Sequence, residues 1–111
     1  MNIVHVAEAI RQFRDLAMAA GFEVLHDSLP LGSVTSCAEA EAQLRLVWDG
    51  NDEYLYLQVS HGVPKAPSSG WLDLFSSKCI GGAFRDPELP EVSFLASVEY
   101  GLDLMLPGAA R

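Results

Sequence analysis

Apolar residues recur at helical spacing near the start of the chain. Successive apolar positions are four, three, four and three residues apart, which places them on one face of a helix. These positions are Val6, Ile10, Phe13, Ala17 and Ala20. Asn2 is suited to cap the start of this helix, and Gly21 stands where a left-handed residue would end it. The pattern predicts an amphipathic N-terminal helix over 4–20.

A period of two residues replaces the helical spacing farther along the chain. Leu44, Leu46 and Trp48 share one phase, and within 53–60 the aliphatic residues Leu55, Leu57 and Val59 share one phase as well. Alternation of this kind is typical of strands with one buried face. The residues 49–52 between the two segments, Asp-Gly-Asn-Asp, favour a turn. The sequence therefore predicts a β-hairpin.

The register of this hairpin follows from the expected loop. A loop over 49–52 pairs Leu46 with Leu55 and Leu44 with Leu57, so that the aliphatic pairs share one face. On the opposite face, each tyrosine would lie opposite a residue of the neighbouring strand, and such cross-strand pairs stabilise a sheet. The pairs expected there are Val47 with Tyr54 and Arg45 with Tyr56.

The segment between the first helix and the hairpin contains patterns that favour different secondary structures. Residues 22–26 are expected to form a short strand, and 27–36, which contain a proline and a glycine, a connection. Alternation extends into 37–43, but these residues are rich in Ala and Glu, and Ser36-x-x-Glu39 has the spacing of a capping box. We therefore expect a helix over 37–43 and a strand after it.

The C-terminal part combines irregular segments with alternating ones. Proline and glycine interrupt 61–70 and 85–90, which are expected to be loops, whereas 71–80 is expected to be a strand. Within 92–106, apolar residues at alternate positions hold one phase, which predicts a last strand; they are Phe94, Ala96, Val98, Tyr100, Leu102, Leu104 and Leu106. Pro90-Glu91 is also a good helix start, so a helix is the alternative for this segment.

These elements add up to one helix followed by about five strands. Parallel strands need long crossover connections, and the sequence offers too few helices to supply them. The expected fold class is α+β, with the amphipathic N-terminal helix packed on a mainly antiparallel sheet. A length of 111 residues fits a single domain spanning 1–111.

The net charge of the chain disfavours some classes of binding partner. Fifteen acidic residues against seven basic ones give a net charge of −8. This charge disfavours nucleic acid and anionic membranes as partners, because both attract Lys and Arg. The sequence shows no secretory leader pattern and no run of about 18 apolar residues that would span a membrane. We expect a cytoplasmic protein.

The sequence shows no recognisable catalytic or cofactor pattern. The histidines at 5, 26 and 61 lack metal-ligand spacing, and neither Cys37 nor Cys79 belongs to a Cys-x-x-Cys pair. Both thiols are expected to be reduced and partly buried. Neither a phosphate-binding glycine motif nor a nucleophile elbow is present. We expect a binding protein without a metal or other cofactor, rather than an enzyme.

Acidic residues concentrate in two segments. Residues 23–53 hold seven acids against Arg45 as the one base, and 86–103 hold five acids and no base. Acidic surfaces keep a small protein in solution, and they are also suited to bind a basic partner, with aromatic rings as anchors. The residues expected to bind that partner are Asp49, Asp52, Glu53, Tyr54, Tyr56, Trp71, Asp86, Glu88 and Glu91.

The chain resembles a known class of small proteins in four features: its size, its acidity, its amphipathic N-terminal helix and its hairpin. The hairpin reads Leu44-Arg45-Leu46-Val47-Trp48-Asp49-Gly50 and Glu53-Tyr54-Leu55-Tyr56-Leu57. In these features the chain resembles the immunity proteins that neutralise bacterial contact-dependent or type VI toxins. The resemblance implies an acidic face that covers a basic, nuclease-like toxin domain.

The chain is also similar to type III secretion chaperones. Those are small, acidic α+β proteins that dimerise and hold an unfolded segment of an effector. They usually end in a long helix, from which the strand expected over 92–106 departs. A homodimer is left open as the assembly state.

Overall fold

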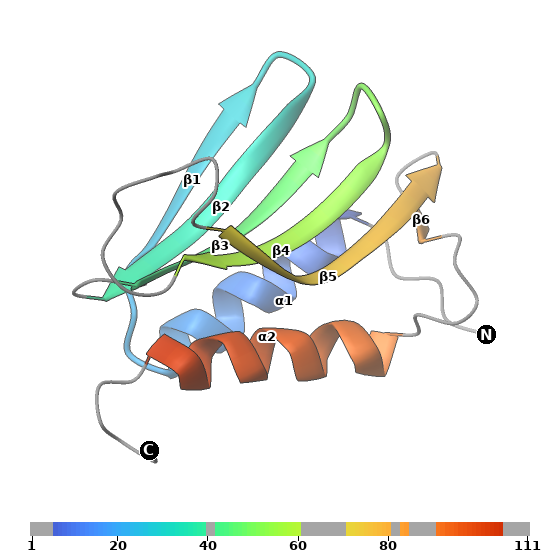
Figure 1. Cartoon of the computed structure of the whole chain (residues 1–111). Helices are drawn as coiled ribbons and strands as arrows, with labels where there is room; N and C mark the ends of the chain where they lie inside the picture. Colours follow the sequence, from blue (N-terminus) through green and yellow to red (C-terminus); the bar gives the residue numbers. More distant parts are fainter. Residues whose placement is uncertain (1–5, 40–41, 61–70, 81–82, 85–90, 106–111) are drawn as a thin grey trace.

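Antiparallel strands and two helices make up the described part of the chain (Figure 1). This computed structural model describes residues 6–39, 42–60, 71–80, 83–84 and 91–105. The elements in chain order are α1 (Val6–Ala19), β1 (Val24–Leu29), β2 (Gly32–Glu39), β3 (Ala42–Asp49), β4 (Tyr54–Ser60), β5 (Trp71–Ile80), β6 (Ala83–Phe84) and α2 (Glu91–Met105). The strands lie in the sheet in chain order, and both helices pack on one face of it. The expected α+β class, with the N-terminal helix on an antiparallel sheet, is confirmed.

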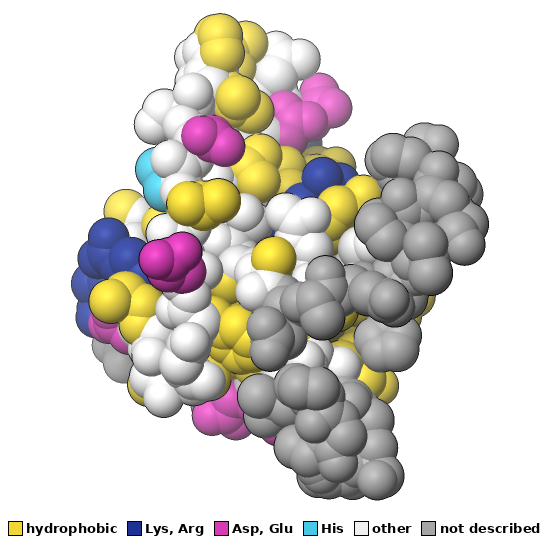
Figure 2. All heavy atoms as spheres, turned by 90° about the vertical axis from the view of Figure 1, so that its left-hand side faces the viewer, with side chains coloured by type: hydrophobic (Ala, Val, Ile, Leu, Met, Phe, Trp, Pro, Cys, Tyr) yellow, Lys and Arg dark blue, Asp and Glu magenta, His cyan; other side chains and the backbone are white. Residues whose placement is uncertain are grey.

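The sheet described here has edges of different kinds. β6, at one edge, is two residues long, whereas β1, at the other, has six residues. The β1–β2 hairpin rises away from both helices (Figure 1). Seen from the side of β1, hydrophobic side chains reach the surface among acidic ones (Figure 2).

The first helix is amphipathic as expected from the sequence, but of the five residues expected on its buried face Ile10 is only partly buried, and Ala20 is exposed beyond its end. Its buried residues are Val6, Ala9, Phe13 and Ala17. Gly21 follows it with a φ of 95°, the left-handed conformation expected there. The N–H of Phe22 donates to the carbonyl of Ala17 and that of Gly21 to the carbonyl of Met18, both at 3.0 Å. This Schellman motif ends α1 and directs the chain into β1. The expected cap residue Asn2 lies outside the described residues.

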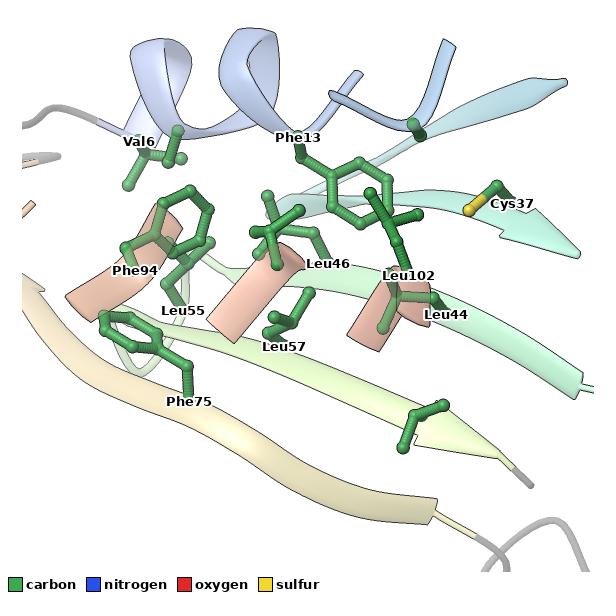
Figure 3. Close-up of a cluster of buried hydrophobic side chains, with 14 of the residues drawn as sticks. Val6, Phe13, Cys37, Leu44, Leu46, Leu55, Leu57, Phe75, Phe94 and Leu102 are labelled. Atoms are coloured by element: carbon green, nitrogen blue, oxygen red, sulfur yellow. The ribbon is translucent and has the colours of Figure 1, made fainter. Parts of the chain in front are cut away.

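One hydrophobic core fills the space between the sheet and the helices (Figure 3). Phe13 of α1, Leu46 of β3 and Phe94 of α2 contribute to it, and each is at most 1% exposed. The rings of Phe75 and Phe94 meet edge to face, with centroids 5.2 Å apart and planes at 75°. Aromatic pairs favour this geometry because of their ring quadrupoles. Trp48 packs against the same core as a partly buried residue.

The β3–β4 hairpin is present, but its register lies two residues from the prediction. Leu46 pairs with Leu57 rather than with Leu55, and the loop is 50–53 rather than 49–52. The other expected pairs are wrong in the same way: Leu44 pairs with Val59, Val47 with Tyr56 and Arg45 with Gln58. A shift of two residues keeps every side chain on its face of the sheet. The expected faces are therefore confirmed although the pairs are not.

Turn chemistry explains the shift. The carboxylate of Asp49 accepts the backbone N–H groups of Asn51 and Asp52 at 3.0 and 3.2 Å. Glu53 adopts a left-handed φ of 59° and returns the chain to β4. Asp49 therefore caps the turn from the last position of β3, where it pairs with Tyr54.

Strands replace both the connection expected over 27–36 and the helix expected over 37–43. β1 and β2 form a hairpin from the pair Val24–Cys37 to the pair Leu29–Gly32, and 37–39 and 42–43 belong to β2 and β3. The helix preference of Ala and Glu amounts to less than about 0.7 kcal/mol per residue. Long-range pairing and burial outweigh it, since Cys37 is only 2% exposed.

The strand expected over 92–106 is also wrong. Residues 91–105 form α2, and Leu106 lies outside the described residues. The residues of α2 that are buried in the core at intervals of four are Phe94, Val98 and Leu102. An interval of four fits both a strand face and a helix face. Gly101 and Met105 have the other strand phase and are also buried, which a helix allows and a strand with one solvent-facing side does not.

The strand expected over 71–80 is confirmed as β5. Its pairing with β4 contains a bulge, because Leu57 pairs with Phe75 whereas Gln58 pairs with Asp73. The loops expected over 61–70 and 85–90 lie outside the described residues.

Candidate functional site

The face of the sheet opposite the helices is left open by the elements described. Successive side chains of a strand point to opposite faces, so the neighbours of the buried leucines in β3 and β4 lie on this open face. On these two strands they include Arg45, Val47, Asp49, Tyr54, Tyr56 and Gln58. Antiparallel sheets commonly have one such solvated face, so its chemistry depends on the side chains gathered there.

One group of side chains lies where the β3–β4 turn meets the open face. We call Asp49, Asp52, Tyr54, Tyr56 and Lys78 the turn cluster. The rings of Tyr54 and Tyr56 are stacked, with centroids 5.8 Å apart and planes 17° from parallel. Lys78 Nζ lies 5.3 Å from the centroid of the Tyr54 ring and donates a hydrogen bond to the carbonyl of Asp52 at 3.0 Å. These contacts hold two rings and a cation beside the turn that carries Asp49 and Asp52.

Negative charge influences the aromatic part of the turn cluster. Burial raises the pKa of the Tyr56 hydroxyl, and the carboxylates of Asp49 and Asp52 raise it further. The hydroxyl therefore stays protonated and able to donate a hydrogen bond at neutral pH. Tyr54 is 37% exposed. A tyrosine with an accessible ring and a polar tip is well suited to anchor another protein.

A second group crosses the middle of the open face. The Arg45 guanidinium lies 3.6 Å from the centroid of the Trp71 ring, and Arg45 Nε donates to Gln58 Oε1 at 2.8 Å. Gln58 Nε2 donates in turn to Asp73 Oδ1 at 2.8 Å. The group links β3, β4 and β5. Hydrogen bonds position the Arg45 guanidinium, and Trp71 stacks on it.

The bulge in β5 brings two of these side chains to the open face. With regular pairing beyond Leu57, Leu74 would lie opposite Gln58. The bulge instead sets Asp73 opposite Gln58 and Trp71 opposite Ser60. Bulges change the direction of side chains in this way, and they are frequent at functional positions.

The structure gathers some of the residues expected to bind a partner and separates others. Asp49, Asp52, Tyr54 and Tyr56 come together in the turn cluster, and Glu53 lies in the same turn. Trp71 pairs with Ser60, six positions along β4 from Tyr54 and thus about 20 Å away. Glu91 begins α2, on the helix-covered side of the sheet. Asp86 and Glu88 lie outside the described residues.

The sequence prediction missed several residues of the open face. Lys78, Gln58 and Asp73 were not expected to take part, because their positions depend on how β4 pairs with β5. The sequence indicates these positions only weakly, since Ser76 and Lys78 lie between the apolar residues Phe75 and Cys79 but Ser77, on the buried face, is polar as well. The sequence prediction also missed the exposed leucines of the β1–β2 hairpin, Leu25, Leu29 and Leu31.

Elsewhere, the described residues show little that could carry a reaction. Cys37 and Cys79 are free and buried, and burial raises the pKa of each thiol to about 11, so neither is poised as a thiolate nucleophile. His26 Nδ1 lies 2.6 Å from the Thr35 hydroxyl. Within the ranges described, no three His, Cys, Asp or Glu side chains are grouped as metal ligands.

No family model matches the chain, and no significant similarity to a curated protein or a solved structure was found. Neither helix described here is long and apolar enough to cross a membrane.

Proposed function

We propose that this chain is a small protein-binding module of the immunity type, which neutralises a toxin by covering a basic surface on it. The observation that carries the proposal is the turn cluster: the stacked Tyr54–Tyr56 pair lies beside the carboxylates of Asp49 and Asp52 on the open face. Aromatic rings anchor interfaces through burial, and carboxylates steer a basic partner toward them.

The geometry favours a preformed binding surface. Asp49 is fixed by two backbone N–H groups, and Lys78 holds the Asp52 carbonyl while lying over the Tyr54 ring. Side chains that are already ordered lose less conformational entropy on binding. The residues that would anchor a partner therefore need little rearrangement.

A second candidate function is favoured by one observation. α2 ends the described part of the chain as a helix of 15 residues, so the departure from type III secretion chaperones that the expected strand implied no longer holds. Such a chaperone would be a stable dimer and would bind an unfolded effector segment. The mass of the purified chain in solution, with the folded or unfolded state of the copurified partner, separates this candidate from the immunity role.

Association kinetics with the copurified partner test the proposal. The variant Asp49→Asn, Asp52→Asn, Glu53→Gln removes three charges at the turn, and the Asn at 49 keeps an oxygen for the turn N–H groups. We expect its association rate to fall about tenfold at low salt, and added salt to slow the native chain similarly. Tyr56→Ala is expected to act mainly on dissociation, because an anchor works at short range.

A matched control removes the same charge elsewhere. Glu23→Gln, Glu99→Gln and Asp103→Asn lie away from the turn cluster and are expected to leave the association rate nearly unchanged. Equal effects of the two triple variants, or an association rate that neither salt nor the turn variant alters, would contradict the proposal.

A further inference from the structure

The outer edge of β1 is an unusual feature of the sheet. β1 pairs with β2 in regular register over six positions, and no described strand pairs with its other side. Alternate residues of an edge strand direct unpaired N–H and C=O groups outward. Edge strands are usually protected by lysine, proline, a bulge or short length, as at the two-residue β6. β1, with the sequence Val-Leu-His-Asp-Ser-Leu, contains no lysine, proline or bulge. Its one carboxylate, Asp27, would repel an acidic strand but attract a basic one.

Side chains on β1 add apolar surface to this edge. Leu25 and Leu29 lie on the open face with Asp27 between them, and they are 65% and 49% exposed. Leu31, in the turn that follows, is 64% exposed. Hydrophobic side chains with acidic ones among them are visible on this side of the molecule (Figure 2). The leucines and the aspartate thus form one alternating row: apolar, acidic, apolar.

The hairpin that carries this edge is held in place. The N–H of Gly50, in the β3–β4 turn, donates to the carbonyl of Leu31 at 2.6 Å. His26, on the other face of β1, contacts the buried Thr35 of β2 through Nδ1 and the hydroxyl, 2.6 Å apart. The edge is therefore ordered before any partner arrives, which lowers the entropic cost of pairing.

A second copy of this chain is a poor occupant. Residues directly opposite each other in an antiparallel pair share a face, so the six residues of β1 cannot overlap fully with themselves around a two-fold axis. That register would set His26 opposite Asp27, which point to different faces. The two nearest registers set Asp27 opposite Asp27 or opposite Leu25 of the second copy. Each copy also carries a net charge of −8, which opposes association.

We propose that the β1 edge binds an extended segment of a partner protein as an additional antiparallel strand, and that the segment carries a Lys or Arg between two apolar residues at alternate positions. Its basic residue pairs with Asp27, and its apolar residues pack on Leu25 and Leu29. Backbone hydrogen bonds along β1 supply affinity, and the alternate side chains supply selectivity. This site is separate from the turn cluster and does not depend on the function proposed for it.

A synthetic peptide tests the inference directly. The probe is Thr-Leu-Thr-Lys-Thr-Leu-Thr with blocked ends, titrated to millimolar concentration into the isotope-labelled chain and followed by amide resonances. We expect the resonances of 24–29 to shift. Two N-methylated versions of the peptide provide the backbone control. Methyl groups on alternate amides in one phase are expected to abolish binding, and those in the other phase to preserve it, because only one set of N–H groups faces β1.

Charge reversal tests the selectivity. Asp27→Lys is expected to weaken binding of the lysine peptide about fivefold and to strengthen binding of the same peptide with Glu in place of Lys by a similar factor. Absence of shifts at 24–29, shifts centred on the turn cluster, or equal binding of both N-methylated peptides would overturn the inference. Asp49→Asn, Asp52→Asn, Glu53→Gln should bind the probe normally. If the peptide does not bind, while this triple variant still associates with the copurified partner more slowly than the native chain does, only the β1 site is refuted.

Discussion

Gly101 allows α2 to lie directly against the side chains of the sheet. A Cβ atom at this position would lie 2.6 Å from Leu44 Cδ1 and 3.0 Å from Leu74 Cδ1. Carbon atoms in contact prefer separations of about 3.5 to 4.0 Å, so Gly101→Ala forces the helix or Leu44 to move by about 1 Å. Leu44 is 0% exposed and is surrounded by other core residues, which leaves it little room.

Two opposing effects set the stability of Gly101→Ala. Alanine inside a helix is more favourable than glycine by about 1 kcal/mol, whereas overpacking a core costs about 1 to 3 kcal/mol. Because the new methyl group meets side chains from both β3 and β5, we expect overpacking to dominate, with a net loss of about 1 kcal/mol. Ala96→Gly, at an exposed position of the same helix, measures the propensity effect alone and is expected to cost about 1 kcal/mol.

Urea unfolding, followed by tryptophan fluorescence and circular dichroism, measures these free energies. Leu44→Ala alone is expected to cost about 3 kcal/mol through the cavity it creates. In the Gly101→Ala background the same change should cost at least about 1 kcal/mol less, because it also relieves the overlap. If the two changes add to within about 0.5 kcal/mol, or if Gly101→Ala stabilises the protein, then α2 does not pack against Leu44 as described.

Two further predictions concern the core. Leu46→Ala is expected to cost about 2 to 4 kcal/mol, and Val47→Ala on the open face much less; equal losses in urea unfolding would contradict the assignment of the faces. Burial raises the pKa of Cys37 and Cys79 from 9.0 to about 11, so these thiols ionise in the unfolded chain before they ionise in the folded one. Their contribution to stability is therefore complete below about pH 9 and is lost as pH rises through about 11. Unfolding curves at pH 8 and 10.5 should show a smaller alkaline loss for the Cys37→Ala, Cys79→Ala variant than for the native chain.

The two helices show when sequence periodicity decides an element and when it does not. The apolar spacing of α1 mixes intervals of three and four, which no strand allows, so its helix could be predicted. In α2 the buried residues Phe94 and Val98 are four apart, an interval that also fits a strand. Pro90-Glu91 favours a helix start, but it does not exclude a strand. The burial of Gly101 and Met105, which depends on packing against the sheet, identifies the helix.

Some features of the strands are determined by local sequence and could be predicted, whereas others are determined by long-range pairing and could not. The β3–β4 hairpin could be predicted because its turn lies between two alternating segments. Its register could not, since Asp49 serves both as the last residue of β3 and as the cap of the turn. Residues 24–26 of β1 fall within the short strand expected over 22–26, whereas the rest of β1 and β2 was missed. β2 forms because it pairs with β1 on one side and β3 on the other, which outweighs the helix preference of Ala and Glu at 37–43.

The candidate site also combines residues joined by one local turn with residues that only long-range pairing brings together. This difference affects how the site would attract a partner. Asp49 and Tyr54 come together because one turn joins them, whereas Trp71 reaches the open face through a bulge that no sequence pattern announces. The described residues of the second acidic segment, from Glu91 onward, belong to α2, which packs on the covered side of the sheet. At physiological ionic strength, charges more than about 8 Å apart are largely screened in water. An approaching basic partner would therefore be attracted mainly by the carboxylates near the turn cluster, which is why local neutralisation should slow association and distant neutralisation should not.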